Sequence, residues 1–364
     1  MYKLAVFPND PLYLYFQKGE VKERYWNPQN LFDEVHVISL CERDIEPEKM
    51  QAVAGQAKLF IHSIGKPSIV SFPLYFNRAF CILKELKPDL VRAHHPWHAG
   101  SLGVYCARRL GIPSVISIHN PIDEQRARQK RLVLYLAKLL EYYCFPRVDI
   151  VISMTEYVSR YAVRMGAKNN VVIFNRVYLD QFTPKTDNNV NNTPRVLSVG
   201  RLENQKYQEC LIRAIADLDV ELTLIGQGQN KELLADLTRE LHLRKRVRFI
   251  DAVAHNEISS YYREADIFAL ATHYEGFCIP ILEAMASRLP IVASDIPAIS
   301  EVLGDAGFLV DNEPASFRAK LVELIESKEL RSELGRRARA RAETIDGIKM
   351  EGLEADLYRE LLTK

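Results

Sequence analysis

The sequence lacks any long hydrophobic run. No stretch approaches the roughly 18 apolar residues that a membrane-spanning helix needs. The apolar start, Met1–Phe7, stops at Pro8 and is too short for the core of a signal peptide, so we interpret it as a first β-strand. We therefore expect a cytoplasmic protein that touches the inner face of a membrane at most peripherally.

Net charge is almost absent as well. The 48 Lys and Arg residues are balanced by 47 Asp and Glu residues, which leaves +1. A chain this close to neutral has no general electrostatic attraction for nucleic acid or for an acidic membrane. We expect no nucleic-acid partner, and we expect any anion-binding site to be a local cluster of cations.

Cysteine motifs are missing too. The 6 cysteines are widely scattered and form no C-x-x-C pair and no zinc spacing. In a chain of this length the pattern is typical of reduced thiols rather than of a disulfide framework. One D-x-D tripeptide, Asp217–Asp219, stands at the end of a predicted helix and does not point to a metal site. Neither the cysteines nor this tripeptide therefore defines a metal site.

What the sequence does contain is a regular alternation of two patterns. Short apolar runs that are rich in β-branched residues alternate with longer segments of helical period, which indicates βαβ units and a parallel sheet. The predicted strands are 4–7, 34–39, 90–93, 114–118 and 150–153, and then 195–199, 221–225, 247–250, 267–271 and 291–293. The predicted fold class is α/β with two Rossmann-like domains.

A polar stretch rich in Asn interrupts this alternation and predicts the domain organisation. We expect a first domain over 1–184, a linker over 185–194 and a second domain over 195–345. A last amphipathic helix, 346–364, is expected to cap the second domain or to cross back to the first. Ligands of open α/β sheets bind outside the carboxyl ends of the strands, so a cleft between the two domains is the expected site.

The first chemical motif follows the strand that ends at Val199. Gly200 permits a tight turn, and Arg201 and Lys206 stand five residues apart at the start of a helix. The Arg fork and the Lys point charge both suit phosphate oxygens, and a helix N-terminus adds a favourable dipole. The pattern indicates a diphosphate-binding corner, although ordinary solvated turns also carry such residues.

The second motif is Glu275-Gly-Phe-Cys-Ile-Pro-Ile-Leu-Glu283. It follows the predicted strand 267–271, and Pro280 suits the first turn of a helix. Gly276 lets the backbone approach a ligand closely, and the amides from Gly276 through Phe277 and Cys278 to Ile279 are candidate donors to a sugar or phosphate. Glu283 lies on an apolar helix face and therefore needs a partner.

These two motifs resemble the donor site of retaining glycosyltransferases of family 4, also called glycosyl transferases group 1, which have the GT-B fold. The resemblance covers most of residues 85–315 and rests on the order of its motifs. Besides Gly200-Arg201-x4-Lys206 and Glu275-x7-Glu283, these are Lys87–His94, Ile112–His119, Val172–Asn175, Leu224-Ile-Gly226-x-Gly228 and Ala293–Asp295 leading to Glu301. The GT-B fold consists of two Rossmann-like domains that face each other across a cleft.

The resemblance implies a role for each matching residue. Arg201 and Lys206 bind the nucleotide diphosphate and stabilise it as a leaving group, and Glu283 holds the ribose hydroxyls. Glu275 lies near the donor sugar, and His119 faces the sugar and the acceptor. Catalysis is therefore assigned to His119, Arg201, Lys206 and Glu275. Donor binding is assigned to Gly200, Arg201, Lys206, Gly226, Gly276, Phe277, Cys278, Ile279 and Glu283.

The chain departs from the family pattern on the acceptor side. A loop over 8–26 replaces the usual Gly-Gly loop, and Gly19 is the candidate to take over part of its role. Arg176 replaces the Gly of the familiar Asn-Gly-Val motif. The segment His94-His-Pro-Trp-His98 is interpreted either as a partly exposed loop or as an acceptor wall, with His94, His95 and Trp97 as contacts.

A basic segment, 126–147, carries six cations and one carboxylate. Its apolar positions recur at helical spacing and are Leu132, Leu136, Leu139, Leu140 and Tyr143. One interpretation is a helix that packs on its own domain through these positions. The other is a basic surface helix that meets anionic lipid.

The function that the resemblance implies is transfer of a hexosyl group from a GDP- or UDP-sugar, with retention and with no metal or other cofactor. The acceptor is a glycan, a lipid-linked molecule or a small molecule, in the synthesis of a surface polysaccharide or glycoconjugate. Two alternatives stay open: a nucleotide-sugar epimerase of the same architecture, and a catalytically idle protein that binds a nucleotide or a partner.

Overall fold

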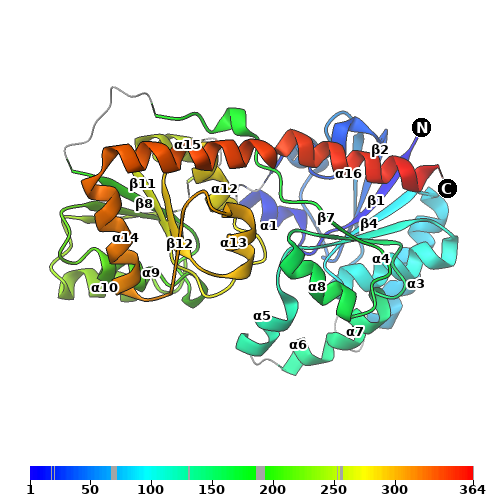
Figure 1. Cartoon of the computed structure of the whole chain (residues 1–364). Coiled ribbons are helices and arrows are strands. Elements are labelled where there is room, and N and C mark those ends of the chain that lie inside the picture. The colour runs from blue at the N-terminus through cyan, green and yellow to red at the C-terminus, as the bar shows by residue number, and fades with distance from the viewer. Residues whose placement is uncertain are drawn as a thin grey trace. The chain divides into compact units, whose positions relative to one another are not determined.

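The structure of the chain is a computed structural model that describes residues 1–17, 19, 21–66, 72–129, 132–185, 193–251, 253–254 and 257–363. It divides into two compact units (Figure 1). Unit 1 consists of Met1–Phe174 together with Lys349–Lys364, and unit 2 consists of Asn175–Ile348. Each unit is described separately below.

Unit 1 contains a seven-stranded parallel sheet in the order β3-β2-β1-β4-β5-β6-β7. Its strands are β1 (Lys3–Phe7), β2 (Glu34–Ser39), β3 (Lys58–Ser63), β4 (Leu90–His94), β5 (Ser114–Ile118), β6 (Ile150–Ser153) and β7 (Asn170–Val172). Its helices are α1 (Leu12–Gln17), η1 (Pro28–Asn30), α2 (Pro47–Met50), η2 (Gln51–Ala54), α3 (Phe72–Leu86), α4 (His98–Leu110), α5 (Ile122–Gln129), α6 (Leu132–Leu136), α7 (Lys138–Cys144), α8 (Glu156–Arg164) and most of α16 (Gly347–Leu362).

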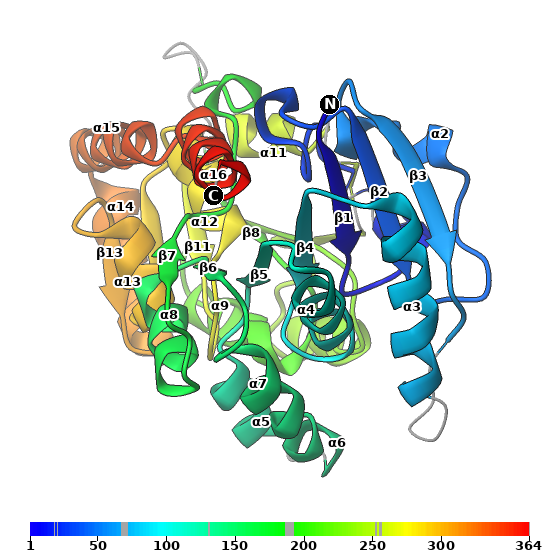
Figure 2. The same ribbon diagram turned by 90° about the vertical axis from the view of Figure 1, so that its right-hand side faces the viewer.

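The local sequence explains the central elements of unit 1. Strands β4 and β5 are buried along their whole length, as expected for central strands of a parallel sheet that is covered on both faces. Helix α4 ends where Gly111 adopts a left-handed φ of 68°, and Pro113 follows shortly afterwards. Figure 2 shows α3 and α4 lying along the same side of this sheet.

Unit 2 contains a six-stranded parallel sheet in the order β10-β9-β8-β11-β12-β13. Its strands are β8 (Arg195–Val199), β9 (Glu221–Ile225), β10 (Val247–Ile250), β11 (Ile267–Leu270), β12 (Ile291–Ser294) and β13 (Phe308–Val310). Its helices are η3 (Leu179–Gln181), η4 (Asn204–Lys206), α9 (Gln208–Ala214), α10 (Lys231–Glu240), α11 (Ile258–Glu264), α12 (Ile279–Ala286), α13 (Pro297–Leu303), α14 (Pro314–Glu326) and α15 (Lys328–Thr344).

Both sheets have the strand order of a Rossmann fold. The order reverses between β1 and β4 in unit 1 and between β8 and β11 in unit 2. At such a reversal, the helices on either side leave room for a ligand at the carboxyl ends of the strands. The prediction of two Rossmann-like α/β domains is confirmed.

The division between the units falls earlier than the predicted boundary at 184. Residues 175–184 belong to unit 2, because the buried side chains of Leu179 and Phe182 pack there. The Arg339 guanidinium donates to the carbonyl oxygens of both residues, at 3.3 and 3.2 Å. Most of the predicted linker, 186–192, lies outside the described residues.

Helix α16 belongs to unit 1 from Lys349 onward. Two of its carboxylates are buried and bind arginines of unit 1. Glu351 binds Arg24 at 2.9 Å, and Glu354 binds Arg92 at 3.2 Å. The end of the chain is therefore part of the first unit rather than a cap on the second.

Candidate functional site

The backbone at the carboxyl end of β8 is shaped by glycines. Gly226 has a φ of 148°, and a Cβ atom at this position would lie 2.1 Å from the carbonyl oxygen of Gly200. The loop after β9 therefore lies directly against the loop after β8, and the Gly200 amide donates to the Ile225 carbonyl at 2.9 Å. Any larger residue at 226 would separate the two loops.

Lys206 and Glu275 form a buried ion pair in this corner. The Lys206 Nζ atom lies 2.5 Å from Glu275 Oε1, and the two side chains are only 10% and 7% exposed. Burial alone would lower the pKa of Lys206, but the negative charge of Glu275 raises this pKa above its ordinary value. The ammonium therefore stays charged at neutral pH. These two predicted residues, 69 positions apart in the chain, are brought into direct contact.

Arg201 lies in a different environment. Its side chain is 65% exposed and forms an ion pair with Glu203 at 3.1 Å. Its backbone carbonyl accepts a hydrogen bond from the Gln208 side chain at 2.9 Å, which holds the loop while the guanidinium extends into solvent. An exposed guanidinium can bind a phosphate without a large desolvation cost.

The loop that contains Glu275 is packed rather than open. Gly276, Phe277 and Cys278 are buried and Ile279 is half-buried, and α12 begins at Ile279 with Pro280 in its first turn. Burial raises the pKa of the Cys278 thiol to about 12, which keeps it protonated and unreactive at neutral pH.

Glu283 has the partner that its burial requires. The Tyr262 hydroxyl donates to Glu283 Oε2 at 2.7 Å, and burial together with the nearby carboxylate holds the Tyr262 pKa well above its ordinary value. Tyr262 comes from α11 and stacks on Phe268 of β11. Sequence reasoning missed Tyr262 because nothing in its local pattern distinguishes it from a core aromatic residue.

Thr272 was also missed. Its hydroxyl lies 2.9 Å from Glu275 Oε1 and 3.1 Å from the carbonyl oxygen of Gln205. The Gln205 side chain in turn donates to the Tyr274 carbonyl at 2.8 Å. These bonds tie the Lys206 loop to the Glu275 loop. The available signal was the position of Thr272, two residues after β11 and three residues before Glu275.

In unit 1, His119 follows β5 and lies at the end of a hydrogen-bonded chain. The Trp26 indole donates to His94 Nε2 at 2.9 Å, so the proton of a neutral His94 is on Nδ1. Burial lowers the pKa of His94 well below its ordinary value, which keeps the ring neutral. His94 Nδ1 then donates to Ser117 Oγ at 3.1 Å, which leaves the Ser117 hydroxyl proton for His119 Nε2 at 3.2 Å.

His94 is therefore a support for His119 rather than an open contact. Both of its ring nitrogens are used, and the side chain is buried. The chain of donors leaves His119, which is half-buried, with its proton on Nδ1.

His95 has a strained environment. Its φ is 70°, and its Nδ1 atom is buried with no hydrogen-bond partner among the described residues. Burial lowers the pKa of His95 to about 3. The ring packs edge-on against Trp97 at 4.2 Å, and the Trp97 indole donates to Glu141 at 2.7 Å. A left-handed backbone and an unpaired buried nitrogen are both costly, which is typical of functional positions.

Gly19 follows α1 with a left-handed φ of 68°. A Cβ atom at this position would meet nothing within 4 Å, so the backbone conformation rather than a close approach explains the glycine. Its neighbours Lys18 and Glu20 lie outside the described residues. Its acceptor role stays a prediction.

The basic segment forms α5, α6 and α7 rather than one packed helix. Arg126 is buried and bound to Glu141, which removes it from any surface cluster of cations. Leu132, Leu136 and Leu139 are exposed, whereas Leu140 is half-buried and Tyr143 packs against the core of unit 1. The segment therefore packs on its own domain as predicted, but not through these three leucines. Leu134, Ala137 and Cys144 form the buried side.

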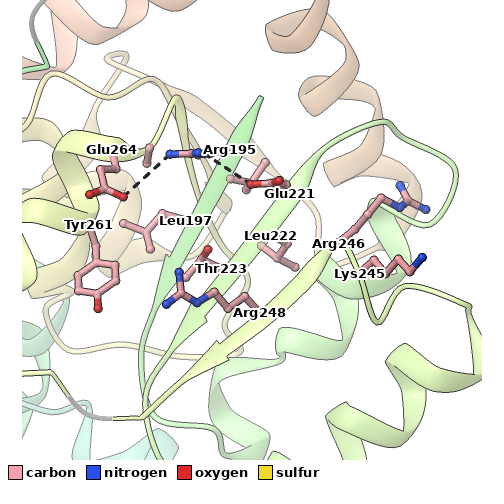
Figure 3. A pocket seen from close by; sticks show the side chains of 12 residues that line it. Arg195, Leu197, Glu221, Leu222, Thr223, Lys245, Arg246, Arg248, Tyr261 and Glu264 are labelled. Carbon is pink, nitrogen blue, oxygen red and sulfur yellow. Dashed lines mark ion pairs between the residues drawn. The ribbon is translucent and has the colours of Figure 1, made fainter. Parts of the chain in front are cut away.

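A further pocket in unit 2 lies at the opposite, amino-terminal ends of the strands (Figure 3). Arg195 begins β8 and binds Glu221 and Glu264 there, at 3.5 and 4.0 Å. Since α/β sheets bind ligands at their carboxyl ends, we do not assign this pocket to the donor. The described residues contain no group of three or more His, Cys, Asp or Glu side chains that could hold a metal ion. Asp217 of the D-x-D tripeptide binds Arg318 at 2.6 Å.

The sequence models of two families divide the chain between them. Glycosyltransferase Family 4 matches residues 30–181, and Glycosyl transferases group 1 matches residues 180–341. The chain belongs to the family-4, group 1 glycosyltransferases. This is a retaining, metal-independent family, and its members transfer sugar from a nucleotide-sugar.

Relatives of this glycosyltransferase differ in what their names say they act on. It is 27% identical over 286 residues to the D-inositol 3-phosphate glycosyltransferase of Corynebacterium diphtheriae, which is 70% of this chain and 67% of that protein. It is 28% identical over 219 residues, 57% of this chain and 59% of the other, to a Campylobacter jejuni enzyme. That enzyme is the N-acetylgalactosamine-N,N'-diacetylbacillosaminyl-diphospho-undecaprenol 4-alpha-N-acetylgalactosaminyltransferase.

The solved structures share the fold. Anabaena HepE in complex with UDP superposes with a TM-score of 0.80 at 18% identity, and the match covers 99% of this chain and 100% of that one. At this identity the likeness establishes the GT-B fold alone. Among the described residues, no helix of this glycosyltransferase is both long enough and apolar enough to cross a bilayer.

Proposed function

We propose that this enzyme transfers a hexosyl group from a UDP- or GDP-sugar and that the corner around Lys206 binds the donor diphosphate. The observation that carries the proposal is the buried ion pair of Lys206 and Glu275 at the reversal point of the unit 2 sheet. A charged lysine held there without a solvent shell interacts strongly with the negative charge that grows on a departing diphosphate.

The position of the Lys206–Glu275 pair also suggests different roles for the two glutamates, Glu275 and Glu283. Glu275 Oε1 lies 2.5 Å from the Lys206 ammonium, so a diphosphate at this ammonium would bring its attached sugar within reach of Glu275. Glu283 lies about one turn into α12, where its carboxylate accepts a hydrogen bond from Tyr262. This position suits a contact to the ribose hydroxyls. Arg201 supplies a second cation to the diphosphate from the exposed side of the loop.

The role proposed for His119 is a polar contact to the transferred sugar and the acceptor. In a front-face retaining reaction, the departing phosphate takes the proton of the acceptor hydroxyl, so no separate general base is required. A neutral His119 with its proton on Nδ1 presents a hydrogen-bond donor to a sugar hydroxyl.

For the acceptor, we propose a lipid-linked glycan in the synthesis of a surface polysaccharide or glycoconjugate. The Campylobacter jejuni relative supports this, because its name places its sugar on a diphospho-undecaprenol carrier. The corynebacterial relative, named for D-inositol 3-phosphate, favours a small-molecule acceptor as the second candidate. Nucleotide release measured with each acceptor class decides between them. Release of nucleotide and free sugar without any acceptor would instead indicate an epimerase.

The donor corner is tested with two matched arginine variants. Arg201→Ala should lower turnover about 10²-fold, because it removes one stabiliser of the leaving group. Arg213→Ala is the control, since Arg213 is also exposed and also paired with a glutamate, Glu209, at 2.9 Å. Both variants should unfold at nearly the wild-type urea concentration. Equal turnover in the two variants would refute the assignment, and activity should persist in the presence of a strong chelator.

The division between the glutamates has its own test. Glu283→Gln should weaken binding of the nucleoside diphosphate, whereas Glu275→Gln should mainly lower the rate of transfer. Tyr262→Phe should weaken nucleotide binding in the same direction as Glu283→Gln, since it releases that carboxylate. Nucleoside diphosphate affinity measured by calorimetry distinguishes the roles. Equal losses of affinity in the two glutamate variants would contradict them.

A further inference from the structure

Helices α6 and α7 expose a continuous apolar stripe. Leu132 and Leu139 are 74% and 69% exposed, and Tyr135, Leu136 and Tyr142 are also exposed. These positions follow the i, i+3, i+4, i+7 spacing of one helix face. Figures 1 and 2 both show α6 at the outer end of the group formed by α5, α6 and α7. Soluble proteins rarely leave such large side chains together in water without a use for them.

The opposite side of these helices is firmly held. Glu141 is fully buried and accepts hydrogen bonds from Arg126, Tyr161 and Trp97, the last at 2.7 Å. The Cys144 thiol donates to the Pro96 carbonyl at 3.1 Å. The exposed stripe therefore belongs to a helix pair with its own anchored inner face, so its exposure does not come from loose packing.

The exposed charges between residues 132 and 147 all have one sign. Glu141 is the sole carboxylate between 132 and 147, and it is buried. Lys138 lies 5.5 Å from the ring of Tyr142, and Arg147 lies 4.8 Å from the ring of Tyr143. Arg108, in the last turn of α4, acts electrostatically on Tyr143 as well. The surface thus presents leucines and tyrosines next to cations, with no exposed carboxylate of its own.

The composition of this surface favours one kind of partner over another. A second copy of the chain would bring the same cations against each other in a two-fold contact, which costs free energy. A bilayer with anionic headgroups accepts both parts: the leucines enter the boundary of the acyl chains, and the cations meet the headgroups. We propose that this α6–α7 surface, made of Leu132, Tyr135, Leu136, Leu139 and Tyr142 with Lys138 and Arg147, docks the enzyme on an anionic lipid bilayer. The docking proposal rests on the proposed function, because a lipid-linked acceptor is anchored in a bilayer of this kind.

The apolar arm of the test uses the full chain and sedimented vesicles of phosphatidylcholine with added phosphatidylglycerol. The triple variant Leu132→Ser, Leu136→Ser and Leu139→Ser should lower the partition coefficient at least about tenfold, because three apolar side chains no longer enter the boundary region. Leu233→Ser is the matched control, since Leu233 on α10 of unit 2 is 60% exposed. It should bind vesicles like the wild type.

The charge arm compares vesicles with and without phosphatidylglycerol. Lys138→Glu with Arg147→Glu should abolish the preference for the anionic vesicles, and added salt should reduce the preference of the wild type. Arg213→Glu in unit 2 is the control. Unchanged partitioning in the triple leucine variant, or a wild type that ignores phosphatidylglycerol, would overturn the proposal. A wild-type dimer that the triple variant converts to a monomer would also overturn it, in favour of a second copy.

Failure of the docking proposal and failure of the proposed function give different results. Binding of nucleoside diphosphates in vesicle-free buffer should be equal in the wild type and in the surface variants. Loss of vesicle binding with intact nucleotide binding is the expected result for the triple variant. A wild type that binds vesicles but no nucleoside diphosphate would refute the proposed donor corner and leave the docking surface supported.

Discussion

At the scale of single residues, the buried ion pair of Lys206 and Glu275 has a structural role as well as the role in sugar transfer that we propose for it. Because both groups are buried, removing one charge leaves the other uncompensated in the interior. The raised pKa of Lys206 means that its stabilising charge is present at neutral pH. This stabilisation is lost only when the pH rises through a folded-state pKa above the ordinary value of 10.5.

Lys206→Met should therefore reduce the free energy of unfolding by about 3–5 kcal/mol and also lower turnover. The double variant Lys206→Met with Glu275→Gln should regain most of the stability, since no unpaired charge is left. Its turnover should stay about 10²–10³-fold below the wild type, because the stabiliser of the leaving group is still missing. Urea unfolding and steady-state turnover measure the two effects. Recovery of turnover together with stability would contradict the assigned role of Lys206.

Ser117 provides a second test at this scale. Ser117→Ala leaves the Nδ1–H of His94 buried without its acceptor and releases His119 from its fixed tautomer. We expect a loss of about 1–3 kcal/mol in stability and a fall in the turnover number with little change in donor affinity. Ser117→Thr keeps the hydroxyl and should restore turnover. Full turnover in the folded fraction of Ser117→Ala, despite a loss of stability, would disprove that the hydrogen bonds through His94 and Ser117 support His119 in catalysis.

Among the secondary-structure elements, α16 contacts unit 1 through buried carboxylates as well as through buried apolar and aromatic side chains. Glu354 binds Arg92 and also accepts from the Tyr358 hydroxyl at 2.5 Å. Its helix neighbour Asp356 forms an ion pair with Arg359 on the surface, where its side chain is 69% exposed. The two acids therefore differ in burial while sharing one helix.

Glu354→Ala should reduce the stability of unit 1 by about 3–5 kcal/mol, because it leaves Arg92 buried and unpaired. Asp356→Ala should change stability by less than about 1 kcal/mol, as exposed ion pairs contribute little. Urea unfolding followed by tryptophan fluorescence measures both effects, since Trp26 and Trp97 lie in unit 1. Similar unfolding midpoints for the two variants would argue against α16 as a structural part of unit 1.

Element prediction succeeded or failed according to burial. A fully buried strand such as β11, with the sequence Ile-Phe-Ala-Leu, has the continuous apolar run that sequence reasoning detects. It missed β3, β7 and β13, which are edge strands with partly exposed residues, although it found the edge strand β10. An edge strand faces water on one side and so carries polar residues that interrupt the apolar run.

For the whole molecule, acid sensitivity should differ between the units. Within the part of the chain that the structure describes, burial lowers the pKa of His36, His62, His94, His95 and His98, which all lie in unit 1. A neutral buried histidine favours the folded state above its unfolded pKa of about 6.5, and this contribution is lost as the pH falls. For His95, with a folded pKa of about 3, the loss at pH 5 is about 2 kcal/mol.

Unit 1 should therefore unfold at a lower urea concentration at pH 5 than at pH 7.5, with a smaller change in unit 2. Tryptophan fluorescence follows unit 1, and far-ultraviolet circular dichroism follows both units. We expect the fluorescence midpoint to fall further than the midpoint of the later circular dichroism transition. Equal shifts in both signals would show that these histidines are not the cause. His95→Gln, which cannot be protonated, should reduce the pH dependence.

The two α/β layers, the glycine turn with its Arg201 and Lys206, and the Glu275–Glu283 segment are readable from the sequence because each is encoded within a few neighbouring residues. Periodicity, helix starts and turn residues are local properties of the chain. The folded chain was needed for every contact between distant positions. It pairs Lys206 with Glu275, gives Glu283 its Tyr262, places Lys349–Lys364 in unit 1 and turns Leu132, Leu136 and Leu139 outward. Such contacts depend on which elements meet in space, and a local pattern of apolar and charged residues is compatible with several partners for each.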